Sequence, residues 1–404
     1  MKRCLKRILS VFMVVIILNI GLPISVKAEG NVQRENEVED NNTRDAANIL
    51  NENASILGKM DSDTDVDYYK YTVQTSGYFK LTLSNYEGNT ENIGFGWDLT
   101  IYDSVMNEIT KINRIKTSYT TMKYNFKKGT VLYFRIENNE DGEYYSAKDV
   151  VYEIKADTVN DAKWEQEKND SRNQATTLSV NKNVYGNIYT DGDADYYKFK
   201  ASQSGYVSFS VLNFDGDVDN IGNGWDLYVY DSNMKELLSV SRITTKYDAG
   251  TFITKKNAVY YVKLVQNDDY YDAIGVIYEL KANFKATSSV ESEKNDTFSK
   301  ANTIKTERYG TLLDGEDKDV YKFVASKSKQ YKITFDNDYE MQYGYNISVC
   351  DSKGKVIKGI YDIKSDASMK FKAKKGKKYY ITISHRSSWA YSYAYLYKLK
   401  IRQV

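Results

Sequence analysis

The chain has 404 residues, with 56 basic and 55 acidic side chains and a formal charge of +1. This length allows two to four domains. The near-neutral balance gives no sign of a basic surface for nucleic acid or for an anionic membrane. The aromatic content of 14% and the 38 tyrosines supply large side chains for hydrophobic cores.

Residues 1–28 have the pattern of a secretory signal peptide. The basic stretch "MKRCLKR" precedes the apolar stretch "ILSVFMVVIILNIGL", and Val26 and Ala28 place small residues where signal peptidase reads the chain. An uncleaved anchor is the alternative, but the apolar run is shorter than the about 20 residues that span a bilayer. We therefore expect a secreted, extracellular protein with no membrane span after signal removal.

Cleavage after Ala28 would remove five basic residues and no acidic residue, so the formal charge would fall from +1 to −4. One cysteine, Cys350, and one histidine, His385, would remain. No intrachain disulfide could then form. An exported protein without disulfides needs large hydrophobic cores or another source of stability, such as a bound metal ion.

Three copies of one sequence pattern follow the leader. Landmarks of the first copy recur 128 residues later, without a gap: Glu37 and Glu165, Asp67 and Asp195, Trp97 and Trp225. A diverged third copy opens at Glu291 and has "YNISVCDS" in place of the tryptophan segment. We expect three domains at 36–158, 164–285 and 290–404, each long enough for its own core.

Short segments with a period of two run through every copy. "YYKYTV", "YFKLTL", "DLTIYD" and "VLYFRI" alternate apolar and polar residues and are separated by turn clusters. They predict an all-β chain of three tandem antiparallel β-sandwich domains. Brief helices are expected only after the acidic clusters, as in "SRNQATTL". Tyr152, Tyr278 and Tyr397 are expected in the cores.

Each copy opens with an acidic cluster, "EVEDNNT", "EQEKNDS" or "ESEKNDT". In an extended chain the side chains at i, i+2 and i+4 share one face, about 7 Å apart. A second acidic group precedes the next strand of each copy: Asp63, Asp65 and Asp67; Asp191, Asp193 and Asp195; Glu316, Asp317 and Asp319. Oxygen-only ligands suit Ca²⁺, and the lack of His and Cys disfavours zinc and copper. The alternative is a solvated linker in which Asp170 or Asp296 caps a short helix.

The pattern E-x-E-x-N-D-[ST], a later glycine, D-x-D-[YV]-Y and G-x-x-YY resembles the bacterial pre-peptidase C-terminal domain. It is especially similar to the collagen-binding domains of bacterial collagenases. This resemblance implies a jelly-roll-like sandwich and calcium ions that dock the N-terminal linker onto it. The implied metal ligands are Glu37, Glu39, Asn41 and Asp67; Glu165, Glu167, Asn169, Asp170 and Asp195; and Glu291, Glu293, Asn295, Asp296 and Asp319.

The first and second copies depart from the family pattern at particular positions. Asn42 stands where the family has aspartate, which should weaken the first site. Thr64 and Gly192 occupy the position of the family's intermediate aspartate, with carboxylates beside them, while Glu316 could serve in the third copy.

The family's collagen-contacting tyrosines have no counterpart here. The corresponding positions hold Glu137 and Asn139, Val265 and Asn267, and Ser384 and Arg386. This departure argues against collagen as the ligand. The third copy instead has an alternating aromatic row that could bind a peptide or a glycan, or could extend a core strand: Trp389, Tyr391, Tyr393 and Tyr395.

Catalysis is the rival class of function. A single histidine after the leader excludes a Ser/His or Cys/His device from the first two copies. A Cys350–His385 pair has no motif that supplies an orienting group, and the acidic residues recur in every copy as a structural ion site would. We predict a non-catalytic binding protein for an extracellular protein, peptide or glycan. The alternatives are an accessory subunit of a separately encoded secreted protease and a hydrolase with an unrecognised acid pair.

Overall fold

The computed structural model describes residues 33–88, 90–91, 93–139, 146–214, 221–267, 273–312, 315–337, 344–386 and 396–404. In these ranges the chain forms β-strands and one 3₁₀ helix, η1 (Arg44–Ala46), with no α-helix. The predicted all-β fold class is confirmed. The described residues contain no helix long and apolar enough to cross a bilayer.

The first sandwich has two five-stranded sheets, in the orders β2-β4-β9-β6-β7 and β1-β3-β10-β5-β8. Its strands are β1 (Gln33–Asn36), β2 (Asn48–Leu50), β3 (Ala54–Lys59), β4 (Val66–Thr72), β5 (Gly77–Asn85), β6 (Trp97–Tyr102), β7 (Glu108–Ile115), β8 (Ser118–Thr120), β9 (Val131–Asn138) and β10 (Val151–Asn160).

The second sandwich has the sheet orders β11-β13-β18-β15-β16 and β12-β19-β14-β17. Its strands are β11 (Thr176–Thr177), β12 (Asn183–Gly186), β13 (Ala194–Lys200), β14 (Gly205–Asn213), β15 (Trp225–Tyr230), β16 (Glu236–Ile243), β17 (Lys246–Thr254), β18 (Val259–Gln266) and β19 (Tyr278–Ala286).

The third sandwich repeats this plan, with the sheet orders β20-β22-β27-β24-β25 and β21-β28-β23-β26. Its strands are β20 (Asn302–Thr303), β21 (Glu307–Gly310), β22 (Lys318–Val324), β23 (Lys329–Asn337), β24 (Tyr345–Cys350), β25 (Val356–Ile363), β26 (Ala367–Ala373), β27 (Lys378–His385) and β28 (Tyr397–Gln403).

Each sandwich has its own hydrophobic core, because alternate residues of its strands point between the two sheets. Trp97 and Trp225 are fully buried in the first two cores. Tyr345 takes their place in the third: it faces His385 across the ladder as Trp225 faces Gln266. Tyr152, Tyr278 and Tyr397 are fully buried, so their predicted place in the core is confirmed.

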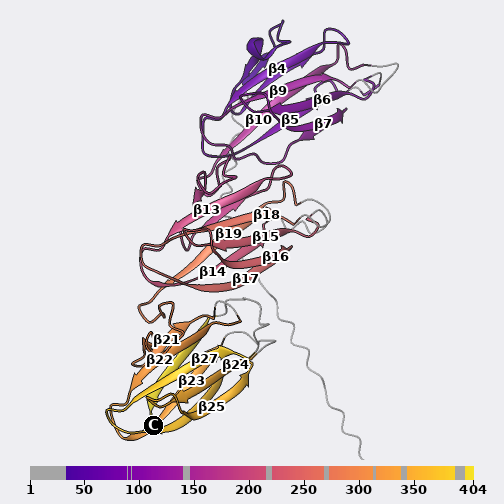
Figure 1. The fold of residues 1–404 in the computed structure, drawn as a ribbon. Helices are drawn as coiled ribbons and strands as arrows, with labels where there is room; N and C mark the ends of the chain where they lie inside the picture. The colour runs from indigo at the N-terminus through magenta and orange to yellow at the C-terminus, as the bar shows by residue number, and fades with distance from the viewer. Residues whose placement is uncertain are drawn as a thin grey trace, which may run out of the picture.

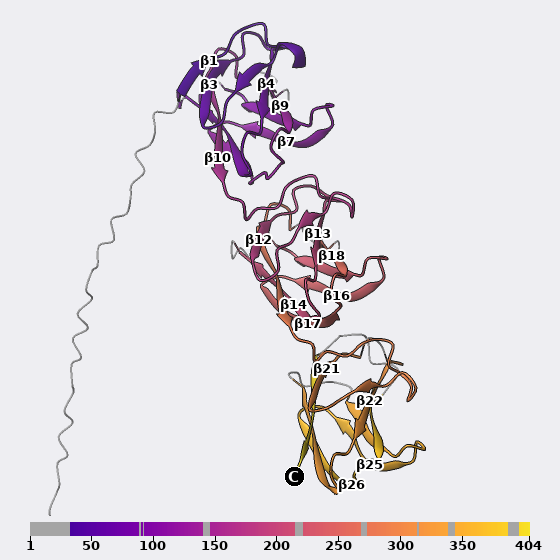
Figure 2. The same ribbon diagram turned by 90° about the vertical axis from the view of Figure 1, so that its left-hand side faces the viewer.

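The three sandwiches follow one another end to end in chain order (Figures 1 and 2). The acidic segment that opens the second and the third sandwich lies at the end that faces the preceding sandwich. The predicted helices after these segments are wrong for the second sandwich, where residues 171–174 form turns. The chain there continues into β11, which pairs in parallel with β13. In the first sandwich only η1 forms at this place.

The predicted aromatic row of Trp389, Tyr391, Tyr393 and Tyr395 lies outside the described residues.

Candidate metal centres

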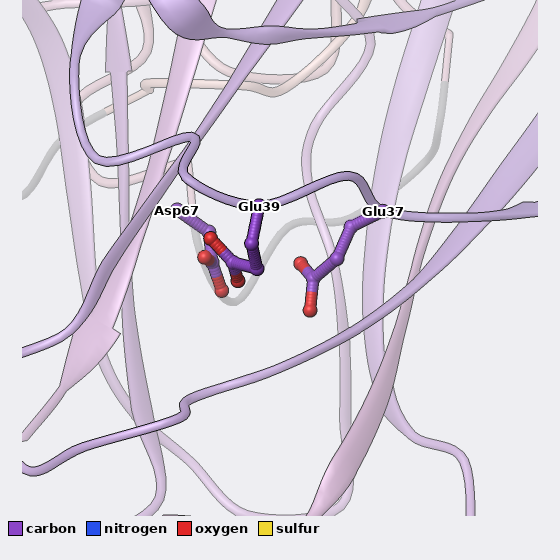
Figure 3. Close-up of side chains that lie close together, drawn as sticks. All are labelled: Glu37, Glu39 and Asp67. Atoms are coloured by element: carbon purple, nitrogen blue, oxygen red, sulfur yellow. The ribbon is translucent and has the colours of Figure 1, made fainter.

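The first acidic cluster lies where the chain passes from β1 toward η1. Glu37 directly follows β1, Glu39 comes two residues later, and Asp67 lies on β4. One carboxylate oxygen from each of the three lies within 4.8 Å of the other two. Figure 3 shows the three side chains turned toward the same space. Asp67 is fully buried, whereas Glu39 is exposed.

The second and third sandwiches repeat this triad and add another. Glu167 belongs to both clusters of the second sandwich, and Glu293 belongs to both clusters of the third. The four clusters are Glu165, Glu167 and Asp195; Glu167, Asp170 and Asp193; Glu291, Glu293 and Asp319; and Glu293, Asp296 and Asp317. Each of these two sandwiches therefore brings five carboxylates to one end.

Several buried oxygens at these clusters have no hydrogen-bond partner among the described residues. In all three sandwiches the inner aspartate has one such oxygen: Oδ1 of Asp67, Asp195 and Asp319. The others are Oδ1 of Asn41 and Asn169, Oε1 of Glu167 and Glu293, and Oδ1 of Asp193. Buried polar atoms are normally paired, so a group of unpaired oxygens that share one space has the chemistry of a cation site.

Two buried tyrosines hold the inner carboxylates of each triad. In the first sandwich the Tyr69 hydroxyl donates to Glu37 Oε2 at 2.8 Å, and the Tyr152 hydroxyl donates to Asp67. The second sandwich places Tyr197 and Tyr278 on Glu165 and Asp195 in the same way. The third uses Tyr321 and Tyr397 on Glu291 and Asp319. These hydroxyls fix one oxygen of each carboxylate. The other oxygen of each aspartate has no partner among the described residues, whereas Oε1 of each glutamate accepts from a backbone amide.

A glycine makes room for this arrangement in every sandwich. A Cβ on Gly186 would collide with the Glu165 carboxylate and the Tyr278 hydroxyl. A Cβ on Gly58 would meet the corresponding groups of Glu37 and Tyr152, and a Cβ on Gly310 would meet the hydroxyls of Tyr397 and Tyr321. The next backbone amide, that of Asn187, donates to Glu165 Oε1 at 3.0 Å. The later glycine of the sequence pattern is therefore a close-approach position.

Burial raises the carboxyl pKa values at these centres. Loss of hydration, and secondarily the neighbouring Glu37 charge, raises the pKa of Asp67 to about 8. Burial likewise raises the pKa of Glu293 to about 8 and that of Asp193 to about 7. A divalent cation would offset both the mutual repulsion and the lost hydration.

The first sandwich covers the centre of the second. The side-chain amide of Asn125 donates to Glu165 Oε1 at 3.2 Å, and the backbone carbonyl of Asn125 accepts from the backbone amide of Glu167 at 3.0 Å. The Lys127 amide donates in turn to the Glu167 carbonyl at 3.1 Å. Phe126 packs edge-on against Tyr189 with the ring centres 5.7 Å apart. Both glutamates are consequently buried, with Glu165 at 0% and Glu167 at 1% exposure.

The junction before the third sandwich is looser. Ile253 stands where the repeat places Asn125 in the first sandwich and brings no side-chain donor to Glu291. A cavity of about 260 Å³ lies here, lined by residues of the second sandwich that include Phe252 and Ile253, and by Glu291, Glu293 and Thr311. Glu293 is half-buried rather than buried.

The first centre is the most open, and Asn42 changes its chemistry. With its nitrogen toward these acceptors, the Asn42 amide donates to Asp65 Oδ1 and to the Val66 carbonyl, both at 2.7 Å. Asp170 and Asp296 occupy the matching position in the second and third sandwiches, where each belongs to the second cluster. The first sandwich thus has a neutral side-chain amide at the position where the other two have an additional carboxylate.

The structure brings together all of the acidic residues that the family resemblance implied as ligands, whereas Asp63, Asp65, Asp191 and Glu316 belong to none of the clusters. Asp193 and Asp317 supply the intermediate carboxylates, and Asp317, not Glu316, belongs to the third sandwich's second cluster. Sequence reasoning treated the tyrosines only as core residues and missed their hydrogen bonds to the carboxylates. The second tyrosine of "DYYK" and the one in "VYEIK" recur in register with the acids, which was the available signal. It also missed Asn125, whose role depends on the contact between sandwiches.

The donor set fits calcium better than it fits other common metals. Every candidate ligand is a carboxylate or amide oxygen, and five carboxylates at one end are enough for a site that takes six to eight oxygens. No imidazole or thiolate belongs to any of these clusters, so the soft-ligand metals are disfavoured.

The one histidine and the one cysteine of the described residues are far apart. Along the β24–β27 ladder, His385 faces Tyr345 and Cys350 faces Tyr380. The two lie at opposite ends of these strands, five residues apart, which is about 17 Å at the rise of a strand. They cannot form a catalytic pair in this geometry.

No protein-family model matches the chain. In sequence it is similar to Collagenase ColT of Clostridium tetani (strain Massachusetts / E88), at 26% identity over 204 residues. The match covers 48% of this chain and 19% of the collagenase, so the chain spans about a fifth of the length of that relative. This weak similarity supports the resemblance to collagenase pre-peptidase C-terminal domains over part of the chain.

Matches among solved structures have low TM-scores. The pre-peptidase C-terminal domain of a collagenase from Bacillus anthracis is 20% identical, and the match covers 94% of that domain and 27% of this chain with a TM-score of 0.22. Tripeptidyl peptidase 2 is 7% identical, over 88% of this chain and 32% of that protein, with a TM-score of 0.21.

Proposed function

We propose that this chain is an exported, non-catalytic binding protein whose three sandwiches are stabilised by calcium. The observation that carries the proposal is the group of carboxylates that converge at one end of every sandwich, each group including an inner aspartate with an unpaired buried oxygen. Such a cluster is unfavourable without a cation, because like charges repel and buried charges lose hydration. Ca²⁺ at this position would bind the folded chain and not the unfolded one.

The residues that would hold the ion belong to two separate stretches of each sandwich. Glu165, Glu167 and Asn169 come from the segment before β11, and Asp195 comes from β13. An ion between them would tie the entering chain to the sheet and close the end of the sandwich. The buried tyrosines would orient the carboxylates from behind, as outer-shell partners do in other metal sites.

The test is thermal unfolding of the protein without its leader, in saturating calcium and in chelator. A ligand at 100 times its dissociation constant stabilises the folded state by about 2.7 kcal/mol per site. The expected result is a melting temperature that is several degrees higher in calcium. Magnesium, which prefers a smaller octahedral site, should give a smaller gain. Superimposable curves in calcium and chelator would overturn the metal proposal.

The binding role rests on the leader pattern of residues 1–28 and on the similarity to part of a collagenase. We propose that the chain attaches to an extracellular protein, peptide or glycan. Capture of matrix proteins and cell-wall glycans by the immobilised chain tests this role. The expected result is saturable retention of one of these classes, and retention of none would contradict it.

A further inference from the structure

A pocket on the second sandwich has no lining residue in common with the acidic clusters. Its volume is about 520 Å³, and its lining includes Ala162, Trp164, Thr177, Lys182 and Val184. It opens where the entering chain runs beside β12 and the end of β11. Backbone carbonyls form a frame around this pocket. The same frame recurs in the third sandwich, where a side chain of the protein itself fills it.

The two frames match bond for bond. In the second sandwich the Tyr185 backbone amide donates to the Lys163 carbonyl, and the Tyr185 carbonyl accepts from the Glu165 amide, each at 2.9 Å. In the third, the Tyr309 backbone amide donates to the Ser289 carbonyl, and the Tyr309 carbonyl accepts from the Glu291 amide, also at 2.9 Å. The carbonyls of the residues in between therefore point to the other side of the entering chain. These carbonyls belong to Ala162 and Trp164 in the second sandwich, and to Ser288 and Val290 in the third.

The strand beside this frame matches as well. Thr177 pairs with Lys198 as Thr303 pairs with Lys322, in parallel ladders. The next amides, those of Leu178 and Ile304, donate across these ladders at 2.8 and 3.0 Å. The third carbonyl of the frame therefore belongs to Thr177 in one sandwich and to Thr303 in the other.

Arg308 fills the frame of the third sandwich. Its Nη1 donates to the Ser288 and Val290 carbonyls at 3.0 and 2.9 Å, and its Nε and Nη2 donate to the Thr303 carbonyl, both at 3.0 Å. One guanidinium thus satisfies three backbone carbonyls, in the planar geometry that arginine offers and lysine does not.

Val184 occupies the position of Arg308 in the second sandwich: each is the second residue of its strand, β12 or β21. Valine has no donor, so it leaves the three carbonyls without a guanidinium and leaves the pocket open. The undescribed segments after residue 32 contain neither lysine nor arginine. None of these segments can therefore supply the missing cation.

We propose that this pocket binds the guanidinium of an arginine from a protein ligand. The ligand's arginine would donate to the carbonyls of Ala162, Trp164 and Thr177, as Arg308 does within the third sandwich. The exposed Lys163 and Lys182 also line the pocket. They favour an arginine that has a carboxylate beside it, as the last residue of a polypeptide or before an acidic residue. This inference goes beyond the metal-centre proposal, because it concerns a separate site.

The test uses the protein without its leader, labelled with 5-fluorotryptophan, at one fixed calcium concentration. The chain has four tryptophans, and Trp164 lines the pocket while Trp97 and Trp225 lie in the cores. Trp164→Phe identifies the Trp164 resonance. N-acetylarginine, which has a guanidinium and a free carboxylate, should shift this resonance saturably and leave those of Trp97 and Trp225 in place. The neutral analogue N-acetylcitrulline should bind at least tenfold more weakly.

Val184→Arg is the matched variant, since it places an arginine at the position that Arg308 occupies in the third sandwich. It should abolish the response of Trp164 to N-acetylarginine and raise the melting temperature of the second sandwich. Arg308→Ala provides a second measurement, because it opens the same frame in the third sandwich. N-acetylarginine should raise the melting temperature of that variant more than that of the parent.

The absence of a saturable shift of Trp164 in the parent would overturn the proposal. Equal binding of the citrulline analogue, or an unchanged response in a folded Val184→Arg variant, would do the same. Because calcium is held constant throughout, any of these results would leave the metal-centre proposal standing.

Discussion

The acidic clusters of the first and second sandwiches start from the same motif and end in different environments. In the second, the first sandwich covers the cluster, Asn125 donates to Glu165, and Asp170 adds a carboxylate. In the first, Glu39 is exposed, and Asn42 replaces the added carboxylate with hydrogen bonds to Asp65 and Val66. The residue at position 42 or 170 and the presence of a preceding sandwich thus set how much charge is buried. They therefore also set how much the stability of each cluster should depend on a cation.

The largest expected effect is the pH dependence of stability without calcium, because it acts on every centre at once. A carboxyl group with a raised pKa binds more protons in the folded chain than in the unfolded one. Its favourable contribution is complete below the unfolded pKa near 4 and is lost as pH rises through the folded pKa. With Asp193 at about 7 and Asp67 and Glu293 at about 8, stability in chelator should fall between pH 4 and 8.

Calcium should reverse this slope, since ion binding requires ionised carboxylates. Hydrogen exchange followed by mass spectrometry, at several pH values with and without calcium, resolves the three sandwiches. In chelator, stability should fall most steeply with pH in the second sandwich, because more of its clustered carboxyls are buried than in the other two. A stability that rises with pH in chelator would contradict the buried-charge description.

The next effect is the loss of the glutamate that both clusters of the second sandwich share. Glu167→Gln should cost about 3–5 kcal/mol of unfolding free energy in calcium, the range for breaking a buried charge arrangement. Its matched control, Glu39→Gln at the exposed first centre, should cost about 1 kcal/mol or less. Urea unfolding in calcium measures both. In chelator the sign should invert for Glu167→Gln, because the variant removes a repelled charge; equal losses in both solutions would speak against an ion.

Asn42→Asp would convert the first centre toward the layout of the second. In calcium the added carboxylate should complete a second cluster and stabilise the first sandwich by about 2.7 kcal/mol at 100 times the dissociation constant. In chelator it should destabilise, because the hydrogen bonds to Asp65 and Val66 are replaced by like-charge repulsion. Calorimetric titration should show one more calcium per protein molecule, and an unchanged stoichiometry would show that position 42 does not decide the number of ions.

The last effect, of similar or smaller size, concerns the cover of the second centre. Asn125→Ala removes the donor to Glu165 and should cost about 1.5–3 kcal/mol, the range for a hydrogen bond to a charged group. Ile253→Ala, at the matching place before the third sandwich, removes no such bond and should cost less. Hydrogen exchange of the Glu167 amide, which bonds to the Asn125 carbonyl, reports on the junction. Similar losses in the two variants would mean that the cover contributes only apolar packing.

The sequence by itself determined the strand content, the repeat and the identity of the clustered acids. Alternation with period two specifies strands locally, and residues at i, i+2 and i+4 share a face where the chain is extended. Glu165, Glu167 and Asp195 could therefore be singled out from the repeated pattern alone. Of the brief helices expected after the acidic clusters, η1 forms in the first sandwich, whereas residues 171–174 of the second form a bend and turns.

Only the tertiary structure decided which atoms share a space across long stretches of sequence. The Tyr278 hydroxyl reaches Asp195 from 83 residues away, and Asn125 reaches Glu165 from 40 residues away in another sandwich. The carbonyl frame that Arg308 fills and Val184 leaves open is backbone geometry, which no residue pattern records. Such contacts depend on register and on the packing of one sandwich against the next, because side-chain type alone does not fix distance.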